Sequence, residues 1–335
     1  MKTLTISSHY PNTALANCPG DAADHRALLA AAGMPPAILG NPDTRVPVEN
    51  YARLYRLISR RMDDEAFGYL PGRLPYGTFA IGAEYAAHSD NVGEALTKIC
   101  RYYRVVSDDF GLTLDRADRL VSFDLQLADP ARDRRGLLTE IMLCIGYRFT
   151  SWLAGRNIDL DHARFAFAAP AHMQEYIYLF PCPLHFDQPG GSAVVFDRRY
   201  LDLPVLKSRS QIAEYLTRTP YDLMNKLLGG NSISNRVYGA LSRSEPDGAR
   251  DLPAIAADLG VTEQTLRRKL KAEGVTFRSI KHQLRKDTAI YHLINSDQKL
   301  AEIADLLGFS TPGAFSRAFK SWTGMPPDVY RNRDD

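Results

Sequence analysis

The sequence predicts an α+β N-terminal domain followed by an all-α C-terminal domain with two helix-turn-helix motifs joined by a linker helix. Three observations support this fold class. Helical and alternating segments are mixed in roughly the first 230 residues. A polar stretch, EPDGARD, follows them at residues 245–251. Beyond it one short helical pattern occurs twice, and no strand alternation is found.

The elements of the first part follow from hydrophobic periodicity and from their caps. Three early helices are expected, one ended by Gly33 and one begun by Asn91. A β-hairpin, an apolar central helix, two more strands and a helix that Pro220 kinks or splits come next. In chain order the segments are 21–33, 47–62, 91–106, 111–127, 137–155, 163–170, 191–199 and 210–230.

Composition limits the class of protein. A chain of 335 residues with 45% hydrophobic residues suits two folded domains. No stretch approaches about 18 uninterrupted apolar residues, and the N-terminus lacks a secretory signal, so we expect a cytoplasmic protein without a membrane span. The four cysteines are scattered, which disfavours disulfides and a metal site, and no cofactor is expected. The net charge of +2 does not by itself indicate a nucleic-acid partner.

The first copy of the repeated pattern begins at Leu252. The stretch LPAIAADL is expected to form a helix with one buried side. Gly260 ends it, because glycine tolerates the left-handed backbone of a tight turn. Thr262 is a suitable N-cap for a second helix, in which Leu266 and Leu270 form the buried side. Its polar and basic side chains then face solvent.

The second copy repeats this chemistry closely. Residues 303–308 match residues 255–260 at an offset of 48, and Ser310 is the expected N-cap. Phe315 and Phe319 replace the two leucines at an offset of 49, so the second turn contains one additional residue.

Two short helices joined by such a turn form a helix-turn-helix, whose second helix enters the major groove of DNA. Residues 277–297 carry a helical apolar stripe and are long enough to hold two such units about one DNA turn apart. The duplication therefore predicts two DNA readers on one face. The alternative is a helical bundle that does not bind DNA, because a single Ala-x-x-x-Gly pattern occurs by chance in many helical hairpins.

About 80 residues of the tail resemble the AraC/XylS family of bacterial transcription regulators. The family pattern is met at Gly308–Ser310, Phe315–Phe319, Gly324 and Pro327–Arg331. Upstream, FPCPLHFDQPGGSAVVFDRRYLDLPV is similar to the sensor domain of the subgroup with an arabinose-binding-type N-terminal domain. The resemblance does not imply arabinose as the ligand.

The resemblance implies a transcription regulator that a small-molecule metabolite controls, either an activator or a dual regulator. Its implied partners are double-stranded promoter DNA, RNA polymerase and a second copy of the chain, in the cytoplasm at the nucleoid. The expected domains are a flexible arm at 1–20, a ligand-sensing and dimerisation domain at 21–230 and a DNA-binding domain at 231–335. The two helix-turn-helix motifs lie at about 252–273 and 300–323.

Matched positions in the family imply the DNA contacts. Arginine suits guanine and glutamine suits adenine, whereas residues at helix N-termini suit phosphates. The implied base-reading residues are Gln264, Arg267, Arg268, Thr311, Ser316 and Arg317. The implied phosphate contacts are Thr262, Lys271, Ser310 and Lys320. Because Pro312 and Gly313 stand where the family usually has longer polar side chains, the first unit is expected to carry most of the direct base reading.

No pocket is marked clearly in the upstream region. Arginine and tyrosine side chains suit a carboxylate ligand, which favours an anionic or amino-acid-like metabolite. The candidates are Arg101, Tyr102, Tyr103, Arg148, Trp152 and His185. For each of them the alternative is a structural role, because buried polar groups are usually satisfied internally.

Motifs of common enzymes are not found, including the phosphate-binding loop, the nucleophile elbow and the H-E-x-x-H zinc motif. We therefore expect that the protein is not an enzyme. The alternative is an enzyme, or a catalytically active sensor domain, fused to a DNA-binding tail. An architectural DNA binder without a ligand is disfavoured, because the upstream region would then have no purpose.

Overall fold

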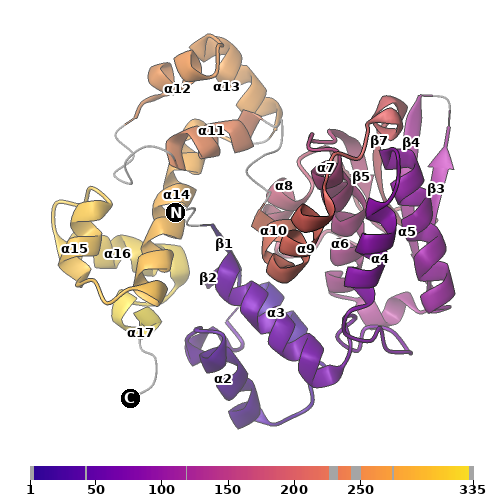
Figure 1. The fold of residues 1–335 in the computed structure, drawn as a ribbon. Coiled ribbons are helices and arrows are strands. Elements are labelled where there is room, and N and C mark those ends of the chain that lie inside the picture. The colour runs from indigo at the N-terminus through magenta and orange to yellow at the C-terminus, as the bar shows by residue number, and fades with distance from the viewer. Residues whose placement is uncertain are drawn as a thin grey trace. The chain divides into compact units, whose positions relative to one another are not determined.

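The computed structural model describes residues 4–41, 44–117, 119–225, 233–242, 250–273 and 275–331 (Figure 1). The chain forms two compact units. The sheet unit takes its described residues from 13–19 and 56–226, and the tail unit takes its described residues from 1–12, 20–55 and 227–335. The predicted combination of an α+β part and an all-helical C-terminal part is confirmed. The predicted joint falls partly in 226–232 and 243–249, outside the described residues.

One mixed sheet organises the sheet unit, with strand order β3-β4-β7-β5-β6. The strands are β3 (Phe110–Arg116), β4 (Leu120–Leu127), β5 (Leu160–Arg164), β6 (Leu184–His185) and β7 (Ser192–Asp197). Neighbouring strands are antiparallel except β5 and β6. The hairpin β3–β4 confirms the strand pair predicted from alternation.

The two faces of this sheet differ in polarity. Phe123 and Leu125 of β4 are buried under helices on one face. On the other face Arg164 of β5 pairs with Asp124 of β4 and donates to Ser122. Alternation along β4 produces both faces, because successive side chains of a strand point to opposite sides.

Helices cover the apolar face (Figure 1). The helical segments of this unit include α4 (Thr78–Ala87), α5 (Val92–Val106), α6 (Leu137–Cys144), a π-helical turn (Ile145–Phe149), α7 (Thr150–Leu153), α8 (Tyr176–Leu179), α9 (Arg209–Arg218) and α10 (Tyr221–Asn225). Of these, α5 and α6 contact the strands directly. The segment 137–153 is the predicted central helix. Gly146 lets it approach β4, because a Cβ there would collide with the Phe123 ring. Asn91 caps α5 as expected, and Pro220 lies between α9 and α10.

Two expectations for the sheet unit need correction. The strand expected at 163–170 ends at Arg164. The Phe165 amide still donates to the His185 carbonyl of β6, but the next amide, of Ala166, donates to the side chain of Ser192 and leaves the ladder. Helix α4 was not predicted. Its sequence, TFAIGAEYAA, is rich in small residues and lacks a clear apolar stripe.

The tail unit contains a short two-stranded sheet and the helices of the C-terminal part of the chain. Its elements are β1 (Thr5–Ser7), α1 (His9–Leu15), α2 (Ala22–Ala31), β2 (Arg45–Pro47), α3 (Val48–Met62), α11 (Ile233–Ser242), α12 (Leu252–Asp258), α13 (Glu263–Ala272), α14 (Phe277–Asn295), α15 (Leu300–Leu306), α16 (Pro312–Thr323) and α17 (Pro327–Arg331). Helices α1 and α3 have residues in both units.

The start of the chain differs from the loose arm that the sequence indicated. Residues 5–7 form strand β1 and residues 9–15 form helix α1, and Ile6 and Tyr10 are buried. β1 pairs with β2 in antiparallel register, so Ile6 lies opposite Val46. Strand pairing with a distant segment explains why local periodicity did not reveal this element. The limits of the functional domains stay a prediction.

None of the helices among the described residues is both long and apolar enough to cross a membrane.

Candidate nucleic-acid interface and sensor residues

The first helix-turn-helix consists of α12 and α13. Asp251 caps α12 by accepting from the Ala254 amide at 3.0 Å. Gly260 in the turn has φ +67°, the left-handed conformation expected there. Thr262 caps α13 as predicted, since its hydroxyl accepts from the Thr265 amide at 3.2 Å.

The buried side of α13 fixes which residues face solvent. Leu266 and Leu270 are buried in a core that α11, α12 and the first half of α14 complete. The predicted DNA-contacting side chains of this helix are therefore on its open side. Exposed residues of this set are Thr262, Gln264, Arg267, Arg268 and Lys271. Arg267 lies 4.0 Å from Glu263 one turn earlier, in a solvent-exposed ion pair that gains little.

The second helix-turn-helix consists of α15 and α16. Gly308 in its turn has φ +71°, and Gly324 ends α16 with φ +73°. Phe315 and Phe319 are completely buried, as predicted. The matched glycine of the first copy, Gly274, lies outside the described residues.

The expected cap of the second copy was wrong by one residue. Thr311, and not Ser310, caps α16, because its hydroxyl accepts from the Ala314 amide at 3.1 Å. The additional residue lies in the turn before the cap, so Thr311 stands at the same offset of 49 as Phe315 and Phe319. Ser310 is then an exposed turn residue.

This corrected register aligns the two recognition helices. Arg268 corresponds to Arg317 and Lys271 to Lys320, and all four side chains are exposed. Gln264, however, corresponds to a glycine, and Arg267 corresponds to the half-buried Ser316. A Cβ built on Gly313 would meet only the Arg317 guanidinium, 3.7 Å away, so this position is open. The open side of α16 is thus poorer in long polar side chains.

The linker helix α14 carries both copies. Its first half contributes Ile280 and Leu284 to the core of the first copy. Its second half contributes Ile290 and Leu293 to the core of the second copy. Basic residues also gather on α14: burial, Lys286, Arg285 and Arg278 lower the pKa of His282. The tail unit therefore has the predicted arrangement of two helix-turn-helix units on one spacer helix.

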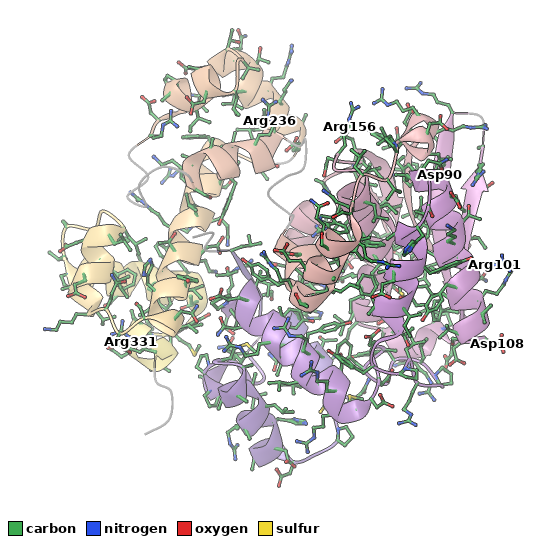
Figure 2. All side chains as sticks on the ribbon, viewed as in Figure 1. Asp90, Arg101, Asp108, Arg156, Arg236 and Arg331 are labelled. Carbon is green, nitrogen blue, oxygen red and sulfur yellow. The ribbon has the colours of Figure 1, made fainter. Side chains whose placement is uncertain are left out.

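The candidate effector residues lie on several separate elements, and none of them is among the residues that line the cavity described below. Arg101 is exposed and projects from α5 (Figure 2). Tyr102 donates to the Thr78 carbonyl at 2.8 Å, and Tyr103 is buried against Phe110. Burial raises the pKa of both tyrosines.

The other three candidates lie on other elements. Arg148 is buried and donates to the Leu179 and Leu223 carbonyls at 2.9 and 3.1 Å. Trp152 stacks on the Tyr215 ring with centroids 4.1 Å apart. His185 is exposed. These contacts match the structural alternative that the sequence left open.

A cavity of about 470 Å³ lies elsewhere in the sheet unit. It is lined by Leu125, Gln126, Leu127, Pro130, Ala131, Asp133, Arg134, Thr139, Ala166, Phe167, Gly190, Gly191 and Ser192. Burial raises the pKa of Asp133 to about 6, although Thr139 and the Leu138 amide donate hydrogen bonds to its carboxylate. The sequence did not reveal this cavity. Gly190 and Gly191, with φ of +89° and +96°, precede β7 and form part of the cavity wall.

Similarity to known proteins identifies the class. Residues 23–205 match the family described as the arabinose-binding domain of AraC transcription regulator, N-terminal. Residues 255–333 match a helix-turn-helix domain. The first match alone spans more than half of the chain, so this protein belongs to the AraC family of transcription regulators. It combines a ligand-binding N-terminal domain with a helix-turn-helix DNA-binding domain.

Two relatives match almost the whole length. The ornithine utilization regulator of Pseudomonas aeruginosa is 27% identical over 91% of this chain and 90% of its own. The HTH-type transcriptional regulator VirS of Mycobacterium tuberculosis is 25% identical over 92% of this chain and 91% of its own. Among solved structures, the transcriptional regulator CdpR of Pseudomonas aeruginosa is 22% identical, with a TM-score of 0.32 over 93% of this chain and 98% of its own.

Proposed function

We propose that α13 and α16 enter successive major-groove segments of a promoter. The observation that carries this proposal is the matched pair of capped helices, each with a buried side and an exposed arginine at the same position. Arg268, Arg267 and Gln264 read bases from the first helix, and Arg317 and Ser316 do so from the second. The domain limits at 21–230 and 231–335 belong to this proposal.

The corrected cap changes the proposed role of Thr311. Thr311 was expected to read a base, but its hydroxyl caps α16 as Thr262 caps α13. Both threonines, with Lys271 and Lys320, therefore suit phosphate contacts near the helix ends. Ser310, exposed in the turn, remains a phosphate candidate.

The test begins with selection of a duplex from a random-sequence library by the full-length protein. Binding to the selected duplex should be at least about a thousandfold tighter than to random DNA and should weaken steeply with salt. Equal affinity for both duplexes at every salt concentration would exclude sequence-specific binding, and with it the regulator function.

We also propose that a small-molecule effector occupies the cavity beside Asp133. The cavity is large enough for a metabolite, and it combines apolar walls with a carboxylate, a hydroxyl and exposed backbone. This location competes with the predicted set around Arg101, Tyr102 and Arg148. The relative named for ornithine utilization makes amino acids, ornithine among them, the first compounds to test.

Calorimetry on the full-length protein with an amino-acid and carboxylate panel distinguishes the two locations. Ala166→Phe, which fills the cavity, should abolish binding, whereas Arg101→Ala should leave it unchanged. The reverse result would place the effector at the predicted arginine and tyrosine set. Binding of neutral apolar compounds alone would contradict the amino-acid class.

The remaining parts of the proposal concern regulation. We infer that the protein activates transcription with RNA polymerase, acts as a homodimer in the cytoplasm at the nucleoid, and is not an enzyme. Its named relatives are regulators, which agrees with this view. A reporter assay with the selected duplex upstream of a promoter tests activation, and sedimentation of the full-length protein tests dimerisation. Turnover of a bound metabolite would favour the enzymatic alternative.

A further inference from the structure

A buried carboxylate lies at the midpoint of the linker helix. Asp287 of α14 is 1% exposed, between the residues that α14 gives to the first core and those that it gives to the second. It follows Leu284 by three residues and precedes Ile290 by three, so it stands on the buried stripe of the helix. An acidic residue at such a position requires partners, because an unpaired buried charge is very unfavourable.

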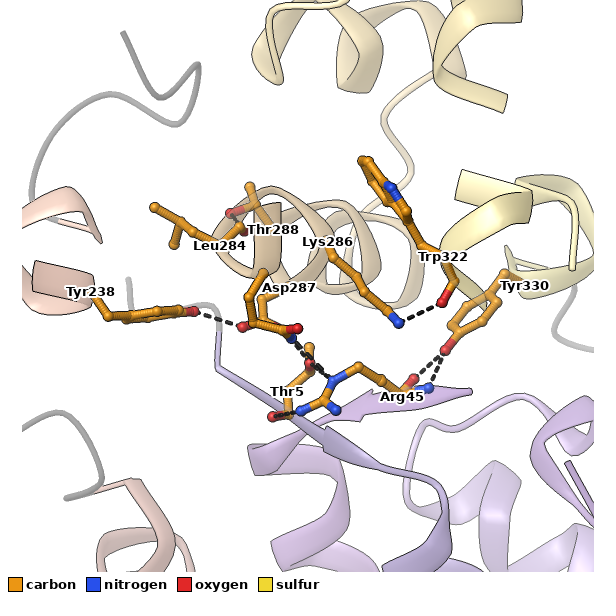
Figure 3. A network of polar contacts seen from close by, with 10 residues as sticks. Thr5, Arg45, Tyr238, Leu284, Lys286, Asp287, Thr288, Trp322 and Tyr330 are labelled. Carbon is orange, nitrogen blue, oxygen red and sulfur yellow. Dashed lines mark hydrogen bonds and ion pairs between the residues drawn. The ribbon is translucent and has the colours of Figure 1, made fainter. Parts of the chain in front are cut away.

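Those partners come from three other elements (Figure 3). Tyr238 of α11 donates to Asp287 Oδ2 at 2.7 Å. Thr5 of β1 donates to Oδ1, and Arg45 Nε of β2 lies 3.7 Å from the same oxygen. Gln283, one turn earlier on α14, also donates to Oδ1 at 2.8 Å. Burial raises the pKa of Asp287 to about 6, while Arg45 and these hydrogen bonds act in the opposite direction.

The strand pair β1–β2 is also fixed to the second helix-turn-helix. The Tyr330 hydroxyl of α17 accepts from the Arg45 amide at 2.6 Å and donates to the Arg45 carbonyl. One side chain thus satisfies both backbone groups of a strand residue, which otherwise remain unpaired at a sheet edge. Tyr330 is fully buried and its ring packs edge-on against Phe319 of α16, with centroids 5.1 Å apart.

Arg45 connects these two sets of contacts. Its guanidinium donates to Thr5 Oγ1 at 2.8 Å and to the Thr5 carbonyl at 2.9 Å, which holds the two strands together. Figure 3 shows the resulting chain of contacts from Tyr238 through Asp287 and Arg45 to Tyr330. Tyr238 belongs to the core of the first copy and Tyr330 to the core of the second. The strand pair is therefore bonded to both copies at once.

We propose that the β1–β2 strand pair is a clasp that sets the spacing and orientation of the two helix-turn-helix units. A buried ion pair adds little net stability, because desolvation offsets the attraction, so we assign this one a role in fixing the arrangement of the elements that it joins. The DNA-binding apparatus then includes residues near the start of the chain. Since α3 directly follows β2 and continues into the sheet unit, that unit has a covalent path to the clasp. This inference rests on the proposed DNA binding.

The experiment measures spacing selectivity with the duplex selected by the full-length wild-type protein. Insertion of about five base pairs between its two half-sites moves one of them to the opposite side of the DNA. We expect wild type to bind the insertion duplex at least about thirtyfold more weakly than the selected one, because one helix then misses its groove. In Arg45→Met this ratio should fall to about threefold or less, while binding to an isolated half-site stays within about twofold.

Two further variants guard against a folding defect. Asp287→Asn keeps the shape of the side chain, and Tyr330→Phe keeps its ring while it loses both bonds to Arg45; each should reduce the spacing ratio. Asp258→Asn is the matched control, because it breaks the Arg250 ion pair on the surface of the same unit and should retain the wild-type ratio.

Retention of the wild-type ratio by Asp287→Asn and Tyr330→Phe would overturn the clasp. So would an equal loss of affinity for half-site and full duplex, which indicates simple destabilisation. If wild type selects no duplex at all, the proposed DNA binding fails first, so the two failures are distinguishable.

Discussion

The two helix-turn-helix units share a backbone plan but differ on both sides of their second helices. The core of the first is mainly aliphatic, with Leu266 and Leu270 at its centre. The core of the second contains a cluster of aromatic rings around Phe319, which contacts Phe315, Trp322 and Tyr330. On the exposed side the first unit has the larger side chains: α13 carries long polar residues at positions where α16 has glycine and serine.

This contrast suggests a division of labour. Helix α13, which packs on the mainly aliphatic core, has more long polar side chains on its exposed side. Helix α16, which packs on the aromatic core, has fewer of them. Aromatic rings bury large areas and gain from edge contacts, so the second unit is suited to a structural role. It is also the unit that Tyr330 joins to the N-terminal strands.

Replacement of the central core residues should give the largest effects. Phe319→Ala should lower the free energy of unfolding by about 3–5 kcal/mol and Leu270→Ala by about 2–5 kcal/mol, because each leaves a cavity. Hydrogen exchange of the full-length protein should show faster exchange in α15–α17 for the first variant and in α11–α13 for the second. Equal acceleration of both regions in either variant would show that the copies unfold as one, against the division drawn here.

Loss of the matched arginines should separate the reading functions. Arg268→Ala should reduce discrimination at one base pair by about 1–3 kcal/mol, as expected for a lost guanine contact. Arg317→Ala should reduce discrimination by less than Arg268→Ala does, because α16 has glycine and serine where α13 has long polar side chains. Mobility shifts on the selected duplex and its single-base variants provide the measurement. Lys269→Ala, a change of an exposed cation on α13, is the control.

The opposite result is equally clear. If Arg317→Ala alone abolishes discrimination between base pairs, α16 makes the main base contacts and the ranking of the two units is wrong.

Features set by local sequence could be predicted, and features set by distant pairing could not. The two turns, the leucine and phenylalanine pairs and the Thr262 cap followed from short patterns, because each depends on residues a few positions away. The Thr311 cap was missed because one additional turn residue shifts the register. The strands β1 and β2 have three residues each, too few to show a period of two.

The sequence contains a sign of the buried contacts of Asp287. An acidic residue on the apolar stripe of the linker helix predicts a buried partner. The sequence does not reveal that Arg45 is such a partner, because Arg45 lies 242 residues away in the chain. The same reasoning applies to Arg148 on the apolar central helix. Its partners include the Leu179 and Leu223 carbonyls and the hydroxyl of the neighbouring Tyr147, and no sequence pattern specifies the two carbonyls.

The helix caps offer a smaller test of the corrected register. Thr262→Ala and Thr311→Ala should each lower the free energy of unfolding by about 1 kcal/mol, because the Thr265 and Ala314 amides lose their acceptor. Ser310→Ala should change it by less than about 0.5 kcal/mol, as for an exposed turn residue. Thermal unfolding of the three variants checks this order. A larger loss for Ser310→Ala than for Thr311→Ala would restore the original cap assignment.

The smallest expected effect concerns Gly313, which leaves the exposed side of α16 without a side chain at the position that corresponds to Gln264 in α13. Gly313→Ala should raise the free energy of unfolding by about 0.4–1 kcal/mol, because the position is helical and open, and alanine reduces the freedom of the unfolded chain. Gly308→Ala is the matched control and should destabilise, since its φ of +71° is unfavourable for alanine. Gly313→Gln recreates the side chain of Gln264 and should keep most of this gain while it adds a base preference to the second unit. Destabilisation by both Gly313 variants would mean that the fold itself requires glycine at this position, and the lack of a side chain there would then be a constraint of the fold.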